Sequence, residues 1–322
     1  MIINSKIDTT VNQLAIPECP EKQKVRLSYN SYLKHIEVYP CCAYEIYINK
    51  PMGIITKEDI VNNKLFETLL KIKKQYNEKH PNNIKLLPLC NNIVQLKQKP
   101  YRIDNDILNP IFSCDFTKYN TINSVNVSIQ HTCNLNCIMC GYDHKIDKEA
   151  DELYFLVLEQ IKNHNLKFIE LTQEGEPFFY KERTLKYLES LTLNDCQIVY
   201  IISNITMLND DDIKRLQKIN STIKIHLTAS IDGMTKETYE KIRKNANFEK
   251  AMHNILALIN CGVLKSINFV VFDINQEEIP LALSFCEKYK IRCNLLPLEQ
   301  KHEEYRKIIN DYRSKFYKNR IQ

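Results

Sequence analysis

The chain from residue 125 onward alternates between short β-branched runs and amphipathic segments, and this alternation limits its fold more than any other feature. Six runs have the length and composition of buried strands. They are residues 125–130, 167–172, 197–203, 223–230, 266–272 and 291–296. Helices are expected at about residues 148–163, 181–193, 209–218, 235–260 with a break near 245–247, 276–289 and 300–316. Because parallel strands need helical crossovers, the pattern predicts an α/β fold with a parallel sheet.

Six strand–helix units are too few for a closed eight-fold barrel. We therefore expect a partial (β/α)6 barrel over residues 121–322, open on one side, with its chemistry at the carboxyl ends of the strands. Residues 1–120 lack the alternation and are expected to form a small N-terminal accessory domain packed on the barrel. Within it we expect a hairpin at about 33–49, a helix at 65–79 and an extended connection from about 83 to 120.

Composition narrows the class of protein. Hydrophobic residues make up 44% and charged residues 26% of the 322 positions, as in ordinary globular domains. The net charge of +5 is not gathered into a basic patch, so no nucleic-acid partner is expected. No secretory signal or membrane-spanning apolar run is visible, which predicts a cytoplasmic protein without a membrane partner. Disulfides are disfavoured there, so the 12 cysteines are expected to be core residues, metal ligands or reactive thiols.

Three cysteines follow the first predicted strand, in the segment HTCNLNCIMC. They are Cys133, Cys137 and Cys140. Three thiolates on one short loop suit a cubic iron–sulfur cluster, in which each thiolate binds one iron and the fourth iron keeps an open position. Zinc is the alternative, because His131 and His144 are close in sequence and zinc takes four such ligands. The position of the triplet, at the head of a series of strand–helix units, favours the cluster.

The segment CNLNCIMC resembles the cluster loop of the radical S-adenosylmethionine (SAM) superfamily, with the spacing C-x3-C-x2-C intact. Similar family segments end the next three predicted strands: TQEGEPFF, IISNIT and TASIDGMTKETYEKIRK. The resemblance covers about residues 125–300. It implies a partial barrel that holds a [4Fe–4S] cluster on the three cysteines and binds SAM. Met139 stands where the family often has an aromatic residue, and it is expected to pack against adenine.

The second of these segments is similar to the family's G-G-E-P-like turn, which lines the methionine end of SAM. Gly175, Glu176 and Pro177 match that turn, whereas Glu174 stands where glycine is usual. The resemblance implies that a carboxylate or exposed carbonyl groups of the turn accept hydrogen bonds from the SAM ammonium group.

The third and fourth segments supply the remaining contacts that the resemblance implies. Ser203 and Asn204 match a polar pair that meets the ribose or the methionine part of SAM. Ser230 and Asp232 would face the ribose, and Arg243 would bind the SAM carboxylate. The planar guanidinium group of arginine suits a carboxylate well.

Five cysteines precede the predicted barrel: Cys19, Cys41, Cys42, Cys90 and Cys114. The segment HIEVYPCC resembles the SPASM or twitch modules, which bind a second iron–sulfur cluster. By that resemblance Cys19, Cys41, Cys90 and one of the other two cysteines are ligands. A cysteine expected three residues after Cys90 is missing, as is the glycine of the hairpin turn. The alternative is a decayed module whose cysteines pack in the core or bind zinc.

Four further cysteines lie within the predicted barrel elements: Cys196, Cys261, Cys286 and Cys293. Core packing is the simplest role for each. Cys261 and Cys293 lie near the ends of elements and are candidate hydrogen-atom donors.

The resemblance implies an enzyme that cleaves SAM reductively to a 5′-deoxyadenosyl radical and abstracts a hydrogen atom from a substrate. The electron would come from a donor such as flavodoxin or ferredoxin. A peptide or protein substrate is expected, to be epimerised, crosslinked or otherwise matured. A radical SAM oxidoreductase of a sugar or small metabolite is the alternative. A non-enzymatic iron–sulfur or zinc protein is the alternative from another class, but it would not need Glu176, Asp232 and Arg243 around one ligand.

Overall fold

The structure, a computed structural model, describes residues 24–30, 34–39, 51–79, 84–88, 111–115, 121–141, 146–171, 174–298 and 302–318. Its centre is a nine-stranded sheet with the spatial order β13-β12-β10-β9-β8-β6-β1-β2-β3. These strands are β1 Lys24–Asn30, β2 His35–Tyr39, β3 Gly53–Ile55, β6 Ser124–Ser128, β8 Leu166–Leu171, β9 Cys196–Ser203, β10 Lys224–Ser230, β12 Leu264–Val271 and β13 Arg292–Pro297. The six strands from β6 to β13 pair in parallel.

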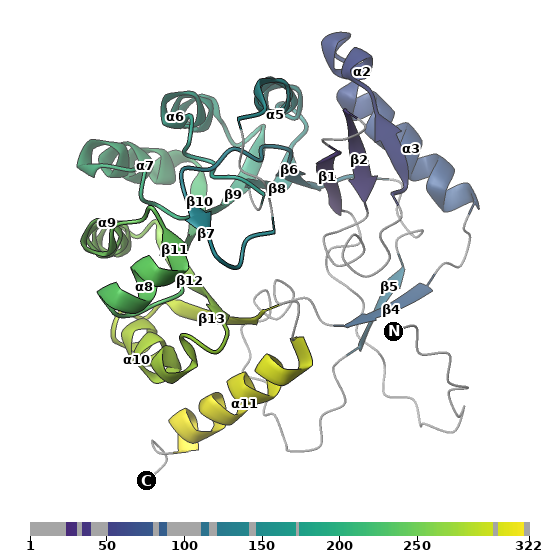
Figure 1. Ribbon diagram of the computed structural model, residues 1–322. Helices are drawn as coiled ribbons and strands as arrows, with labels where there is room; N and C mark the ends of the chain where they lie inside the picture. Colours follow the sequence, from purple (N-terminus) through teal and green to yellow (C-terminus); the bar gives the residue numbers. More distant parts are fainter. Residues whose placement is uncertain are drawn as a thin grey trace, which may run out of the picture.

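Helices follow these parallel strands and cover one face of the curved sheet (Figure 1). They are α5 Lys148–Gln160, α6 Lys181–Ser190, α7 Asp210–Thr222, α8 Lys236–Ile242, α9 Phe248–Asn260 and α10 Ile279–Lys288, the last preceded by the short 3-10 helix η1 Gln276–Glu278. The predicted α/β fold with a parallel sheet is confirmed. The described strands leave the sheet open, with β13 and β3 at its two edges.

Local sequence explains where the helices begin. The Asn209 side chain accepts a hydrogen bond from the Asp212 amide, and the Asp212 carboxylate accepts one from the Asn209 amide. This reciprocal pair is a capping box that starts α7. The expected break near residues 245–247 separates α8 from α9, because Asn247 caps α9 by accepting from the Lys250 amide. Asn245 has a left-handed backbone (φ 70°), a conformation that ends a helix more easily for asparagine than for most residues.

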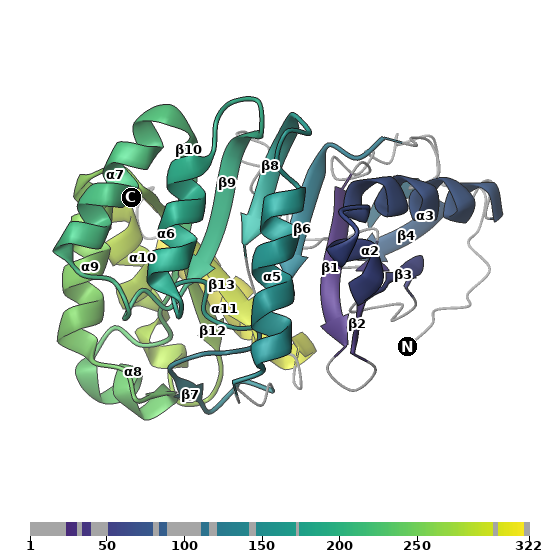
Figure 2. The same cartoon turned by 90° about the horizontal axis from the view of Figure 1, so that it is seen from above.

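The first three described strands belong to the same sheet as the parallel strands. Strand β1 pairs in parallel with β6, and β2 and β3 continue the same sheet in antiparallel order. The sheet therefore runs across the predicted boundary at residue 121 (Figure 2). Most of the hairpin expected at 33–49 lies outside the described residues. On β1, Val25 and Leu27 alternate with polar residues and are fully buried. This alternation, in the segment KVRLSYN, indicates a strand that the sequence analysis did not predict.

The rest of the N-terminal part packs around these strands. Helices α2 (Lys57–Val61) and α3 (Leu65–Lys79) contact α5, and α3 matches the predicted helix at 65–79. Strands β4 (Ile84–Pro88) and β5 (Ile111–Asp115) form a separate antiparallel pair within the connection that was expected to be extended. The final helix α11 (His302–Lys318) contacts β13 and α10. Among the described residues no helix is both long and apolar enough to cross a membrane.

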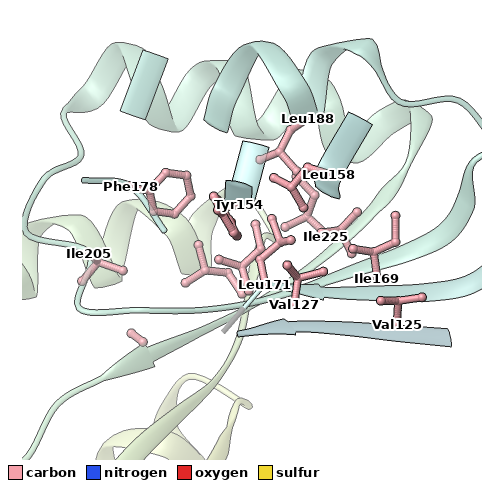
Figure 3. Close-up of a cluster of buried hydrophobic side chains, with 14 of the residues drawn as sticks. Val125, Val127, Tyr154, Leu158, Ile169, Leu171, Phe178, Leu188, Ile205 and Ile225 are labelled. Atoms are coloured by element: carbon pink, nitrogen blue, oxygen red, sulfur yellow. The ribbon is translucent and has the colours of Figure 1, made fainter. Parts of the chain in front are cut away.

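The hydrophobic core lies between the sheet and its helices. Figure 3 shows side chains from β6, β8 and β10 meeting those of α5 and α6. The labelled ones are Val125, Val127, Tyr154, Leu158, Ile169, Leu171, Phe178, Leu188, Ile205 and Ile225. Each is buried, and a fully buried aliphatic side chain contributes about 1.5–3 kcal/mol to folding. Because successive side chains of a strand point to opposite faces, the side chains between these apolar ones lie on the face away from the helices.

The shared sheet gives a test of whether residues 24–79 fold together with the rest. Leu27 is fully buried on β1 and lies in register with Val127 on β6. Leu27→Ala should lower the free energy of unfolding by about 2–5 kcal/mol, within a single transition followed by circular dichroism in denaturant. Leu193→Ala, at a side chain that is 62% exposed, should change it by less than about 0.5 kcal/mol. Two separate transitions, of which Leu27→Ala shifts one alone, would contradict the shared core.

Candidate functional site

The candidate site lies where four parallel strands end. The loops after β6, β8, β9 and β10 contain residues 129–141, 174–180, 204–209 and 231–235. Carboxyl ends of neighbouring parallel strands meet at the same edge of a sheet. Hydrogen bonds between these loops, described below, join them into one structure.

The loop that carries the cysteine triplet is anchored by a short two-stranded ladder. Strand β7 (Asn136–Cys137) pairs antiparallel with β11 (Arg243–Lys244), which follows α8 directly. The Ile138 amide also donates to the Ile242 carbonyl at 3.0 Å. The backbone of the triplet is therefore held by a segment more than a hundred residues later in the chain.

Polar groups lie close to the sulfurs of Cys133 and Cys137. The Leu135 amide lies 3.5 Å from Cys133 Sγ, and the side-chain amide of Asn204 lies 3.7 Å from it. The Arg243 guanidinium lies 3.9 Å from Cys137 Sγ. Cys140 is exposed. Donors of this kind stabilise thiolates, the form of cysteine that binds a metal.

Without a metal, burial opposes that ionisation. Burial raises the pKa of Cys133 to about 12 and also raises the pKa of Cys137, although the nearby Arg243 works in the opposite direction there. A metal centre bound here must therefore displace protons from these thiols. No three histidine, cysteine or acidic side chains in the described part of the chain are grouped tightly enough to hold one metal ion.

The turn after β8 lies directly against the cysteine loop. A Cβ atom on Gly175 would come within 2.7 Å of the Gln130 and Thr132 carbonyl oxygens. The next amide, of Glu176, donates to the Thr132 carbonyl at 2.9 Å. This close backbone approach needs glycine at position 175, because any side chain would push the turn away from the loop.

The Glu176 carboxylate joins the second loop to the third. It accepts hydrogen bonds from the Ser203 hydroxyl and the Asn204 amide, both at 2.7 Å, and from the Phe178 amide at 3.0 Å. Burial raises the pKa of Glu176, and these three donors oppose the rise. Both oxygens therefore serve to fix the loops.

Asn204 extends this network to the cysteine loop. Its side-chain amide donates to Asn134 Oδ1 at 3.0 Å, in addition to its contact with Cys133. Its side-chain oxygen, Oδ1, accepts hydrogen bonds from the amide and hydroxyl of Thr206, at 3.0 and 2.6 Å. Ser203, Asn204 and Glu176 are thus brought together beside the first cysteine.

A buried ion pair connects the fourth loop to the second cysteine. Arg243 Nη2 lies 2.6 Å from Asp232 Oδ2, and Asp232 is fully buried. Burial raises the pKa of Asp232, and the guanidinium group opposes the rise. Asp232 Oδ1 also accepts from the Val270 amide at 2.7 Å. Arg243 therefore lies between a carboxylate and a ligand-type sulfur.

This site stands within a stretch that matches a known family. Residues 127–286 match the family model of the Radical SAM superfamily. The chain contains a radical SAM domain. The superfamily resemblance inferred from the four motifs is therefore confirmed; enzymes of this superfamily use a [4Fe–4S] cluster and SAM.

Several curated relatives share this domain at low identity. A probable GTP 3′,8-cyclase of Methanocaldococcus jannaschii is 24% identical over 170 residues, 51% of this chain and 55% of that protein. The GTP 3′,8-cyclase of Clostridium botulinum is 22% identical over 188 residues, 55% of this chain and 56% of that protein. The chain thus spans about half the length of these curated relatives.

Solved structures share the fold. SuiB of Streptococcus suis, in a crystal structure with S-adenosylmethionine, has a TM-score of 0.51 and 15% identity over 86% of this chain and 57% of that one. SuiB bound to its precursor peptide SuiA has a TM-score of 0.50 and 16% identity, and covers 82% of this chain and 58% of that one.

The other residues expected to contact SAM lie at the same edge of the radical SAM domain. Ser230 is half-buried at the last position of β10, in register with Asn268 of β12. Met139 is half-buried and packs against the core. Pro177 is buried behind the turn, and its carbonyl accepts from the Thr184 hydroxyl at 2.6 Å.

The two candidate hydrogen donors lie away from this edge. Cys261 caps the end of α9, before β12 begins, and its thiol lies 3.4 Å from the Leu258 carbonyl. Cys293 lies near the start of β13, in register with the core residue Ile267. Neither is brought to the cysteine triplet.

The cysteines expected to hold a second cluster fall almost entirely outside the described residues. Cys19, Cys41, Cys42 and Cys90 lie outside them, and so does His144 of the zinc alternative. The backbone of Cys114 is described in β5, in register with Lys85 of β4. The second cluster therefore stays a prediction.

The sequence reading missed a polar face inside the sheet. Neighbouring strands place Asn126, Glu170, Tyr200 and His226 in direct register, on the face away from the helices. Further along this face Thr228 bonds to Ser266 at 2.7 Å, and Asn294 bonds to Asn268 at 2.9 Å. The signal was the polar half of each alternating strand, as in IKIHLTAS. Asn275, which sequence alone predicts to be a turn former, has a further role. Its side-chain amide donates to the backbone carbonyls of Asp232 and Val270, at 2.9 and 2.7 Å.

Two glycines near the triplet give a matched test of the close approach at the turn. Gly175→Ala should force the turn away from the cysteine loop and weaken SAM binding at least about tenfold, measured by equilibrium dialysis of the reconstituted protein. Gly141→Ala is the control, because a Cβ there has nothing within 4 Å. Equal SAM affinities for the two variants would refute the packing argument.

Proposed function

We propose that this protein is a radical SAM enzyme that holds a [4Fe–4S] cluster on Cys133, Cys137 and Cys140 and binds SAM beside it. The convergence of four loops on the cysteine triplet carries the proposal. Asn204, from the loop after β9, and Arg243, from β11, each approach one of the sulfurs. A carrier or sensor protein would have no use for four interlocked loops of this kind.

The residues present fit the cluster and SAM. Three thiols on one loop are the ligand set of a cluster with one open iron, where each sulfur binds a different iron. That arrangement spaces the sulfurs wider than the shell of a single ion. The close backbone approach at Gly175 brings the turn against the cysteine loop, where a small polar molecule could contact both.

The chain itself prepares this site. Arg243 offsets the negative charge of the thiolates, and Asp232 fixes the guanidinium group in place. Glu176 holds the second and third loops together, so their polar groups need not reorganise when SAM binds. When bound, the cluster and SAM supply the electron transfer and the 5′-deoxyadenosyl radical that removes a hydrogen atom from the substrate. The electron is proposed to come from a donor such as flavodoxin or ferredoxin.

The core of the proposal is tested by one product. Anaerobic protein, reconstituted with iron and sulfide and reduced with dithionite, should convert SAM to 5′-deoxyadenosine, measured by chromatography. Changing Cys133, Cys137 and Cys140 to alanine should abolish the product, because the ligands of the cluster are lost. Cys261→Ser, which changes a cysteine remote from the triplet, should retain it. A cluster-loaded protein that binds no SAM and forms no 5′-deoxyadenosine would support a carrier or sensor instead.

For the substrate, we propose a peptide or protein, modified by epimerisation, crosslinking or a related maturation. The fold likeness to SuiB, which has been crystallised with its precursor peptide, supports this choice. The polar face of the sheet also suits it, because the amide and hydroxyl groups of Asn268, Asn294 and Thr228 match the hydrogen-bonding pattern of a peptide backbone.

A small polar metabolite is the second candidate. The curated relatives are named GTP 3′,8-cyclases, which supports it, and the same polar face would bind a nucleotide or sugar. An extract of the source organism, divided by ultrafiltration, separates the two. Stimulation of 5′-deoxyadenosine formation by a retained, protease-sensitive fraction would support the peptide. Stimulation by the filtrate, unaffected by protease, would support the metabolite.

We also propose a second iron–sulfur cluster on Cys19, Cys41, Cys90 and one of Cys42 or Cys114. Reconstituted protein should contain about eight iron atoms per chain. About four would mean a single cluster and would leave the N-terminal cysteines to packing or zinc. Removal of the triplet by substitution should leave about four iron atoms in the first case and almost none in the second.

A further inference from the structure

The first described residue after β8 carries a buried acidic side chain. Glu174 is 5% exposed, and both of its oxygens contact other elements. Oε1 lies 3.2 Å from Arg26 Nη2 and also accepts from the Ser28 hydroxyl at 3.2 Å. Oε2 lies 2.8 Å from His131 Nε2. A strand at the start of the chain and the segment before Cys133 therefore meet on this one carboxylate.

Arg26 is placed for this contact by the parallel pairing of β1 with β6. In that register Arg26 lies opposite Asn126, and its Nη1 donates to Asn126 Oδ1 at 3.1 Å. The guanidinium group thus connects β1, on which Arg26 lies, to two neighbours, β6 and the turn after β8. Residue 26 lies outside the stretch that matches the radical SAM family model, residues 127–286.

The contact between Arg26 and Glu174 matters because it pairs a buried negative charge with a positive one. A carboxylate shielded from water is stable only with a compensating cation or several donors. Removal of Arg26 would leave the buried Glu174 with only Ser28 and His131 beside it, without the permanently charged guanidinium group, so the turn would move to let the carboxylate reach water. Because the backbone of Gly175 packs closely against the Gln130 and Thr132 carbonyls, that movement would separate the turn from the cysteine loop. The movement would therefore reach the loops that meet at the cysteine triplet.

We propose that Arg26 is a positioning residue for SAM binding, acting through Glu174 to hold the turn of Gly175 and Glu176 against the cysteine loop. The N-terminal strand is then a working part of the cofactor site as well as an addition to the sheet. This inference rests on the proposed SAM-binding function of the turn.

Arg26→Met tests it in the full-length protein after anaerobic reconstitution. SAM affinity should fall at least about tenfold, by equilibrium dialysis, while iron content stays at the wild-type level. The change that SAM causes in the electron paramagnetic resonance spectrum of the reduced cluster should need correspondingly more SAM. Glu174→Gln removes the buried charge, and the double variant R26M/E174Q should recover most of the lost affinity, because no uncompensated carboxylate remains.

Arg215→Met is the matched control. Arg215 pairs with Glu182 and Glu189 on the outer helices, so the same substitution there should leave SAM affinity unchanged. Wild-type affinity in R26M, or a double variant no better than R26M, would overturn the inference. Should R26M not fold, Arg26→Gln decides, because it removes the cation, keeps a polar side chain and leaves Glu174 in place. Weaker SAM binding is expected, and wild-type binding would contradict the inference. If the wild-type protein itself does not bind SAM, the proposed function is wrong, and this inference is wrong with it.

Discussion

The ladder between β7 and β11 is the contact on which the candidate site depends. It joins the backbone of Cys137 to that of Arg243, so the loop with the cysteines cannot move without the segment after α8. The same segment carries the guanidinium group that approaches Cys137 and pairs with Asp232. Thus one short stretch of backbone pairing fixes a thiol, a cation and a carboxylate together. Side chains alone, each with several rotamers, would hold these groups less firmly.

The other loops are fixed by buried carboxylates. Glu176 joins the turn after β8 to the loop after β9, Asp232 joins the loop after β10 to β12, and Glu174 joins the turn to β1. Each carboxylate is shielded from water, and each has donors or a cation beside it, which is how proteins tolerate buried charge. The hydrophobic core on the helix side makes this arrangement stable by fixing where each strand ends.

Periodicity located the six parallel strands, because it depends on local pattern. The superfamily motifs, with residues such as Ser203 and Asp232, were recognised from the resemblance of short segments to a known family. What the sequence could not reveal depends on contacts between distant residues. Glu174 reads as a departure from a glycine-rich turn until Arg26, 148 positions earlier, is seen beside it. Likewise Asn275 reads as a turn residue until its contact with the Asp232 carbonyl is known. The addition of β1 to the sheet was missed because pairing partners are not encoded in one strand's alternation.

The two edge strands of the nine-stranded sheet, β3 and β13, differ in how they limit further pairing. At one side the outermost strand, β3, has three residues, too few to offer a long row of unpaired backbone groups. At the other side β13 finishes at Pro297, which has no amide hydrogen to give, and α11 packs alongside it. Short, interrupted or covered borders discourage one molecule from adding its strands to those of another. The described edges of this open sheet therefore offer a second copy of the chain little backbone with which to pair.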